Sequence, residues 1–184
     1  MPSMMPCSYE KPIFVAMKGK LRTISLLLFL VLLEVSMVTA QSRQRLIKQA
    51  YSQYEEGNYA TTVKLLDEAE QKGSRKAYLY YLRGNCKDIL RNHEAAITDF
   101  KLALQRKKKY PEAYAELGLS YFSLERNKDA IQAFDKAIAQ RNDFALAYLN
   151  RGSVKCAAGD AAGARADWEK AKQLGFEHPL ESCD

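Results

Sequence analysis

A chain of 184 residues, 47% of them hydrophobic, is long and apolar enough for one packed domain, which excludes disorder along its whole length. Its 28 basic and 22 acidic residues alternate along the chain, as on the exposed faces of helices, and a net charge of +6 is too small to indicate nucleic-acid binding. The longest basic run, 106–109, has no aromatic residues between its charges and falls in an expected loop. We therefore predict no nucleic-acid partner.

The N-terminal region has the build of an export signal. A basic segment at 18–22 precedes the apolar run 24–33, and small or modest side chains follow at 38–40. This order of features is typical of a secretory signal peptide. We predict a signal peptide over 17–40, with cleavage after Ala40, and interpret 1–16 as an over-extended start or a leader.

A retained membrane anchor at 24–40 is the alternative. That segment has only 17 residues and contains Glu34, whereas a bilayer requires roughly 20 apolar residues. We therefore expect an exported protein, periplasmic or secreted, that contacts a membrane only through an uncleaved signal segment.

Residues of one kind then recur every 34 positions, which indicates a repeat architecture. The recurring sets are Tyr80, Tyr114 and Tyr148; Gly84, Gly118 and Gly152; Ala96, Ala130 and Ala164; Phe100, Phe134 and Trp168; and Ala69, Ala103, Ala137 and Ala171. They define units one to four, which span 43–76, 77–110, 111–144 and 145–178, followed by a tail at 179–184. Each unit carries two amphipathic helical patterns separated by a turn.

The small residues of these sets predict close helix packing within each unit. We expect the glycine at the eighth position and the first alanine set to bring the two helices into backbone contact, while the aromatic residues fill the space around them. One such hairpin cannot bury its own apolar face, so the hairpins are expected to stack.

The 34-residue pattern of Tyr, Gly, Ala, Phe and Ala resembles the tetratricopeptide repeat over 43–178. Unit one departs most, with Leu46, Ala50 and Thr62 in place of the aromatic residue, the glycine and the alanine. The resemblance implies an all-α fold, a right-handed α-solenoid of four 34-residue helical hairpins.

Catalytic and cofactor motifs are not found in the sequence. There is no phosphate-binding glycine loop, no zinc-protease motif and no nucleophile elbow. His93 and His178 have no second histidine or paired cysteine at metal-ligand spacing, so both are interpreted as surface residues. We predict no catalytic residue, no metal site and no cofactor, and hence a protein that is not an enzyme.

The resemblance implies that the first helix of each unit lines a concave groove that binds a protein or peptide. The groove residues selected in this way are Tyr51, Tyr54, Tyr78, Tyr81, Asn85, Asp88, Glu112, Glu116, Leu119, Phe122, Leu149 and Asn150. The tyrosines offer large contact areas, and the acidic residues at the edge favour a basic or neutral ligand over an acidic one. Only Asn85 and Asn150 fit the clamp that holds C-terminal carboxylates in this family, so we do not expect a receptor for chaperone tails.

Three functional hypotheses follow. The first is a non-catalytic scaffold or adaptor, exported to the cell envelope, that binds a partner in the concave groove. The second is a structural subunit of an envelope assembly that contacts partners through the end of the stack. The third, which the lack of catalytic motifs disfavours, is an accessory enzyme.

Cleavage of the signal would leave three cysteines, Cys86, Cys156 and Cys183. Cys86 and Cys156 lie in first helices two units apart, too far for a disulfide, so we predict none within the repeats. Cys183 is expected to be an exposed thiol that can form an intermolecular bridge. We also expect the tail to fold over unit four through Phe176 and Leu180, and weak self-association through this C-terminal edge.

Overall fold

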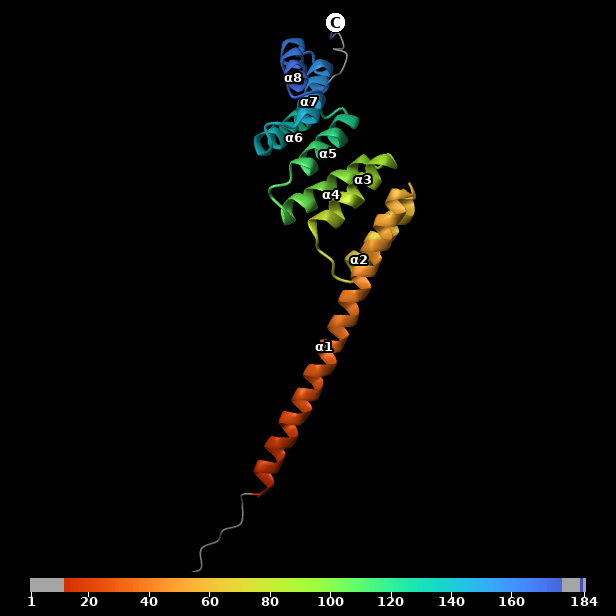
Figure 1. The fold of residues 1–184 in the computed structure, drawn as a ribbon, viewed down its shortest axis with the longest axis vertical. Helices are drawn as coiled ribbons and strands as arrows, with labels where there is room; N and C mark the ends of the chain where they lie inside the picture. The colour runs from red at the N-terminus through yellow and green to blue at the C-terminus, as the bar shows by residue number, and fades with distance from the viewer. Residues whose placement is uncertain (1–11, 177–182, 184) are drawn as a thin grey trace, which may run out of the picture. The chain divides into compact units, whose positions relative to one another are not determined.

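The computed structural model describes residues 12–176 and 183, which form eight helices and no strand (Figure 1). The helices are α1 Pro12–Glu55, α2 Tyr59–Gln71, α3 Ala77–Ile89, α4 His93–Arg106, α5 Pro111–Ser123, α6 Asn127–Gln140, α7 Ala145–Ala157 and α8 Ala161–Gln173. The expected all-α fold is therefore confirmed for the described part of the chain. The chain divides into two compact units, 1–42 and 43–184.

The N-terminal compact unit contributes the first part of helix α1. Its apolar side chains are exposed from Leu26 to Val38. The stretch Ser25–Glu55 of the helix is long and apolar enough, by length and composition, to cross a membrane. A signal sequence and a membrane anchor both have this property, so the helix is consistent with either.

The second compact unit is a solenoid of helical hairpins. Helices α3 and α4, α5 and α6, and α7 and α8 pack as pairs, and each pair also packs on the next through α4 with α5 and α6 with α7 (Figure 1). The end of α1 also packs on α2. Leu46 and Ala50 of α1 share a buried cluster with Leu66 and Ala69 of α2.

The recurring sets form the core of these hairpins. Every alanine of the two sets is buried, as are Phe100, Phe134 and Trp168. The expected role of the glycines holds only in part. A side chain at Gly84 or Gly118 would collide first with the ring of Phe100 or Phe134, whereas one at Gly152 would meet the indole of Trp168 and, at 3.1 Å, the backbone oxygen of Ala164. The glycines therefore make room for the aromatic ring that lies between the helices.

The turn inside each hairpin has a residue in the left-handed backbone conformation at the fifteenth position of the unit. Gly57 and Gly159 take this conformation with φ of 78° and 83°. Arg91 and Glu125 occupy the equivalent positions with φ of 63° and 58°, although L-residues with a side chain disfavour that region. The turn geometry is thus retained in all four units despite the change of residue.

A buried ionic cluster joins units one and two. Arg83 of α3 donates from Nε and Nη2 to the carboxylate of Asp99 on α4 at 2.9 and 2.6 Å, and from Nη1 to Asp67 and Glu70 of α2 at 2.6 Å each. Lys87 donates to Asp99 at 2.7 Å. Burial opposes the charged guanidinium, yet its hydrogen bonds to Asp99 and Glu70 raise the pKa of Arg83 above its ordinary value.

The same arrangement recurs in unit four. Arg151 of α7 donates to Asp167 of α8 and, at 2.6 Å, to Asp135 of α6, while Lys155 lies 2.8 Å from Asp167. We call each of these sets an Arg–Asp clamp. Each clamp connects one unit to the unit before it.

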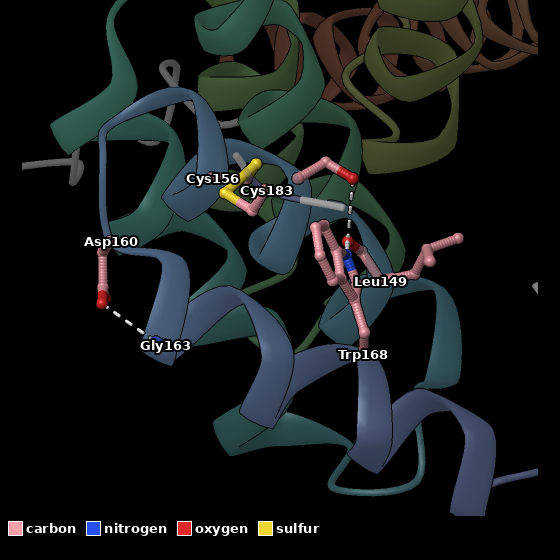
Figure 2. Close-up of a disulfide and its surroundings, with 7 residues drawn as sticks. Leu149, Cys156, Asp160, Gly163, Trp168 and Cys183 are labelled. Carbon is pink, nitrogen blue, oxygen red and sulfur yellow. Dashed lines mark hydrogen bonds between the residues drawn. A yellow bond between two sulfur atoms is a disulfide. The ribbon is translucent and has the colours of Figure 1, made fainter. Parts of the chain in front are cut away.

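The expectation that Cys183 is an unpaired thiol is wrong. Cys183 forms a disulfide with Cys156 at the end of α7, and their α-carbons are 5.6 Å apart (Figure 2). Cys86, in contrast, is a buried free thiol, and no disulfide joins it to Cys156, as predicted.

The last hairpin also differs in its aromatic residue. Trp168 of α8 takes the place of phenylalanine, and its indole Nε1 donates to the backbone oxygen of Leu149 at 3.2 Å (Figure 2). On the outer side of α8, Arg165 and Lys172 are exposed, which suits a helix that ends a stack. Leu180, expected to help cover this helix, and His178 lie outside the described residues.

Candidate functional site

The twelve residues selected for the groove all retain some access to solvent. Tyr51 and Tyr78 are the most accessible, with 45% and 42% of their surface exposed. The other ten are partly buried, and none belongs to the fully buried core. They come from the end of α1 and from α3, α5 and α7, the first helices of the four units.

The groove tyrosines divide into anchored and accessible ones. The ring of Tyr81 lies 5.0 Å from that of Tyr110 and 6.1 Å from that of Phe100, measured between centroids, so it packs on the core. Tyr54 packs in the same way on Tyr59 at 5.7 Å. Tyr78, at 6.5 Å from Tyr81, extends this aromatic surface toward solvent.

Asn85 connects the anchored tyrosines of two helices. Burial raises the pKa of both Tyr54 and Tyr81, and interaction with the Asn85 side chain partly offsets the rise. The amide oxygen Oδ1 of Asn85 is buried and accepts no hydrogen bond from any described residue.

Two carboxylates of α3 and α5 complete the site. Asp88 accepts a hydrogen bond from Ser120 Oγ at 2.7 Å and lies 2.8 Å from Nδ1 of His93. Glu116 has no hydrogen bond or ion pair with any described residue, and burial, together with the charge of Asp88, raises its pKa. The interpretation of His93 as a surface residue is therefore wrong, because pairing with Asp88 holds its side chain largely buried.

We call Tyr54, Tyr81, Asn85, Asp88 and Glu116 the groove cluster, because electrostatic and hydrogen-bond interactions connect them across α1, α3 and α5. A ligand there would meet aromatic surface and negative charge. The arrangement offers no nucleophile with an adjacent base, and the described residues contain no group of acidic, histidine or cysteine side chains that could hold a metal ion.

The remaining selected residues have other surroundings. Glu112 forms an ion pair with Arg141 at 2.7 Å, and Leu119 and Phe122 pack against the core. Among the described residues no interaction connects Leu149 or Asn150 to the groove cluster. The structure thus brings the selected residues of units one to three together and leaves those of unit four apart.

Sequence reasoning missed Tyr110 and Ser120 as parts of the site. Tyr110 precedes α5 and supports the ring of Tyr81, whereas Ser120 is buried and holds Asp88. Neither falls at one of the repeat positions from which the groove residues were selected. A serine one turn after Glu116 on the same helix was the available indication of a polar contact at this point.

Known proteins match both the sequence and the fold. A TPR repeat model matches residues 118–159, and a tetratricopeptide repeat model matches residues 77–110. No protein of curated function has a sequence that matches this chain.

Three solved structures illustrate the similarity of fold. The crystal structure of MamA is 25% identical, with a TM-score of 0.70 over 72% of this chain and 78% of that chain. YrrB, described as a TPR protein with an unusual peptide-binding site, is 18% identical, with a TM-score of 0.66 over 70% of this chain and 66% of that chain. The first TPR of Spaghetti (RPAP3), bound to the HSP90 peptide SRMEEVD, is 17% identical, with a TM-score of 0.62 over 65% of this chain and 94% of that chain.

Proposed function

The chain is a tetratricopeptide repeat protein, and from that premise we propose that it is a non-catalytic scaffold that holds a peptide segment of a partner protein in the groove of units one to three. The observation that carries this proposal is Glu116, a partly buried carboxyl group without a cationic partner among the described residues. Buried charges in proteins are normally paired, so an unpaired one at an accessible groove favours a ligand that supplies the cation.

The chemistry of the groove cluster defines the ligand class. A lysine or arginine side chain can approach Glu116 and Asp88, which lie at the same surface as the groove tyrosines. The rings of Tyr78 and Tyr81 offer contact area for a neighbouring apolar side chain. The ligand is therefore a basic or neutral peptide with apolar residues.

Solved proteins of the same fold support peptide binding in general. YrrB is described by its peptide-binding site, and the RPAP3 repeat holds a peptide whose sequence contains three acidic residues. The groove cluster here contains two carboxylates and no lysine or arginine, so an acidic peptide of that kind would be repelled. The shared fold thus supports the activity, and the local charge sets a different ligand preference.

Fluorescence anisotropy on the full chain in mild detergent tests the groove. The probe is a labelled decapeptide of alternating lysine and leucine, and the reference probe has glutamate in place of lysine. Glu116→Gln should weaken binding of the lysine probe by about tenfold, about 1.4 kcal/mol, because it removes the negative charge without removing the side chain. An unlabelled glutamate peptide should not displace the lysine probe from the groove of the unaltered protein.

Glu169→Gln is the matched control, since Glu169 is an exposed glutamate on α8. It should leave binding of the lysine probe unchanged. If Glu116→Gln and Glu169→Gln bind the lysine probe as tightly as the unaltered chain, the groove is not the site. A structural subunit that contacts its neighbours through the end of the stack would then be the better account.

Export to the envelope forms part of the proposal. The basic, apolar and small-residue order of 17–40 supports a cleaved signal, and the exposed apolar surface of that helical stretch supports insertion into a translocation channel or a bilayer. The mass of the native protein distinguishes the two outcomes. A chain that begins at Gln41 and fractionates with soluble protein supports cleavage, whereas an intact chain in the membrane fraction supports an anchor at 24–40.

A further inference from the structure

The Arg–Asp clamps occur in alternate units, and unit three lacks one. Its residues at the clamp positions are Leu117, Tyr121 and Ala133, where units two and four have arginine, lysine and aspartate. The charge at the fourth clamp position is reversed, because Lys101 stands where the clamps have Asp67 and Asp135. The space between the second helices of units two and three is therefore lined by apolar side chains and a lysine instead of an ionic cluster.

A cavity of about 710 Å³ lies at this place. It is lined by Lys101, Leu104, Gln105 and Lys108 at α4, by Tyr114, Leu117 and Tyr121 of α5, and by Asp129, Gln132, Ala133, Lys136 and Gln140 of α6. We call it the α4–α6 pocket. None of the twelve groove residues lines it, so it is separate from the groove.

The floor of the α4–α6 pocket is apolar, and hydrogen bonds of Gln140 hold one of its walls in place. Leu104, Leu117 and Ala133 are buried at the floor. Gln140 bridges the two units, because its Nε2 donates to the backbone oxygen of Lys108 and its Oε1 accepts from the backbone N–H of Tyr110, both at 2.8 Å. No lining side chain has a buried polar atom without a partner, so the floor offers an apolar group contact but no polar anchor.

The rim of the pocket is positively charged. Lys101 lies 5.5 Å from the ring centroid of Tyr121, and Lys136 lies 5.8 Å from that of Tyr114, so both ammonium groups are held over pocket-lining rings. Neither lysine has a carboxylate within ion-pair distance among the described residues. The one carboxylate of the lining, Asp129, is paired with Arg126 at 2.8 Å.

We propose that the α4–α6 pocket binds an acidic peptide segment of a partner protein, which inserts one apolar or aromatic side chain between α4 and α6 and places its carboxylates on Lys101 and Lys136. In units two and four the chain itself places the carboxylates of Asp99 and Asp167 in the equivalent space. Between units two and three the pocket has two lysines, Lys101 and Lys136, without a carboxylate partner, and the volume suits a bound side chain. The preferred charge is opposite to that of the groove.

Anisotropy on the full chain in mild detergent tests this proposal. The probe is a labelled dodecapeptide of aspartate and glutamate around one central phenylalanine. A filled variant reproduces the clamp of unit four by combining Lys101→Asp, Leu117→Arg, Tyr121→Lys and Ala133→Asp. It should retain the helical circular dichroism of the unaltered chain and bind the probe at least tenfold more weakly.

A second variant keeps the test decisive if the filled variant does not fold. Lys101→Gln with Lys136→Gln changes only exposed side chains and should weaken binding about tenfold, with a smaller dependence on salt. The control, Lys64→Gln with Lys128→Gln, alters exposed lysines outside the pocket and should have no effect. Glu116→Gln, which acts on the groove, should also leave this probe unaffected, so the two proposals fail independently.

Three results would overturn the proposal. The first is that the filled variant or the double lysine variant binds the acidic probe as tightly as the unaltered chain does. The second is displacement of the bound acidic probe, at equally low concentration, by an unlabelled peptide with lysine in place of its acidic residues, or by a single-stranded oligonucleotide. The third is sedimentation equilibrium in which only the unaltered chain dimerises, because a second copy would then be the occupant.

Discussion

The Arg–Asp clamp of unit two predicts a large difference between two aspartates that bond the same arginine. The side chain of Asp99 is 2% exposed and accepts three hydrogen bonds, two from Arg83 and one from Lys87. The Arg83 side chain is 7% exposed, so removal of Asp99 leaves buried positive charge with less compensation. Asp67 is 46% exposed and gives a single contact to Arg83.

These contacts determine the expected magnitudes. Loss of one partner from a buried ion pair costs about 3–5 kcal/mol. We expect Asp99→Ala to lower the free energy of unfolding by about 3 kcal/mol, at the low end, because Arg83 keeps Asp67 and Glu70. Asp67→Ala should lower it by less than about 1 kcal/mol, because that pair is half exposed and Arg83 keeps Asp99.

Urea unfolding of the full chain in mild detergent, followed by circular dichroism, measures both values. A third variant combines Arg83→Leu, Lys87→Tyr and Asp99→Ala, which are the residues of unit three at these positions. It should recover most of the stability that Asp99→Ala loses, since no unpaired buried charge remains. Equal losses for Asp99→Ala and Asp67→Ala would refute the argument from burial.

Four further predictions concern single sites. Glu125→Gly should raise the free energy of unfolding by about 1 kcal/mol in urea unfolding, because glycine adopts a φ of 58° without strain; a loss of stability would contradict this. Cys86 should resist iodoacetamide at pH 8 in the folded protein and react in urea, because burial raises its pKa to about 11; rapid labelling of the folded protein would refute its placement. Reduction of the Cys156–Cys183 disulfide, which closes a loop over 27 positions, should cost up to about 3.5 kcal/mol, and an unchanged urea midpoint would argue against the bond. The raised pKa of Glu116 means that the folded chain holds a proton which the unfolded chain has lost, so its contribution to stability falls as pH rises from the ordinary carboxyl value through the raised one. Urea midpoints across that pH interval should show this fall in the unaltered chain and not in Glu116→Gln, and parallel pH profiles would refute it.

The repeat fold was predictable because packing demands the same residue type at the same place in every unit. The alanines and aromatic rings of the recurring sets are buried together, and this regularity is visible in the sequence at the 34-residue spacing. The contact that each residue makes was less predictable. A glycine that faces helix backbone and one that faces the ring of Phe134 leave the same pattern, and only coordinates distinguish them.

The ionic clusters and the disulfide were missed for different reasons. Arg83 and Asp99 are 16 residues apart and look like two more charges of an exposed helix surface. The available indication was the 68-residue recurrence of the pair as Arg151 and Asp167. The bond of Cys183 depends on the path of a tail that has no repeat pattern, so spacing arguments drawn from the repeats did not reach it.

The groove could be predicted only to the level of positions. The family pattern selects residues of the first helices, and all twelve retain access to solvent. The absence of a cation beside Glu116, the support of Asp88 by Ser120 and the open acceptor of Asn85 depend on neighbouring helices. The role of these residues in binding remains a prediction.

Site-specific photo-crosslinking in the native cell tests the scaffold function most directly. A photoreactive phenylalanine derivative replaces Tyr78, which is aromatic and exposed at the groove, and in a second chain it replaces the exposed Ala166 on α8. We predict that the Tyr78 position becomes covalently attached to one partner protein, through a segment with basic and apolar residues, and that the Ala166 position does not. Attachment of the same partner only from Ala166, or no attachment from Tyr78, would contradict the proposed groove.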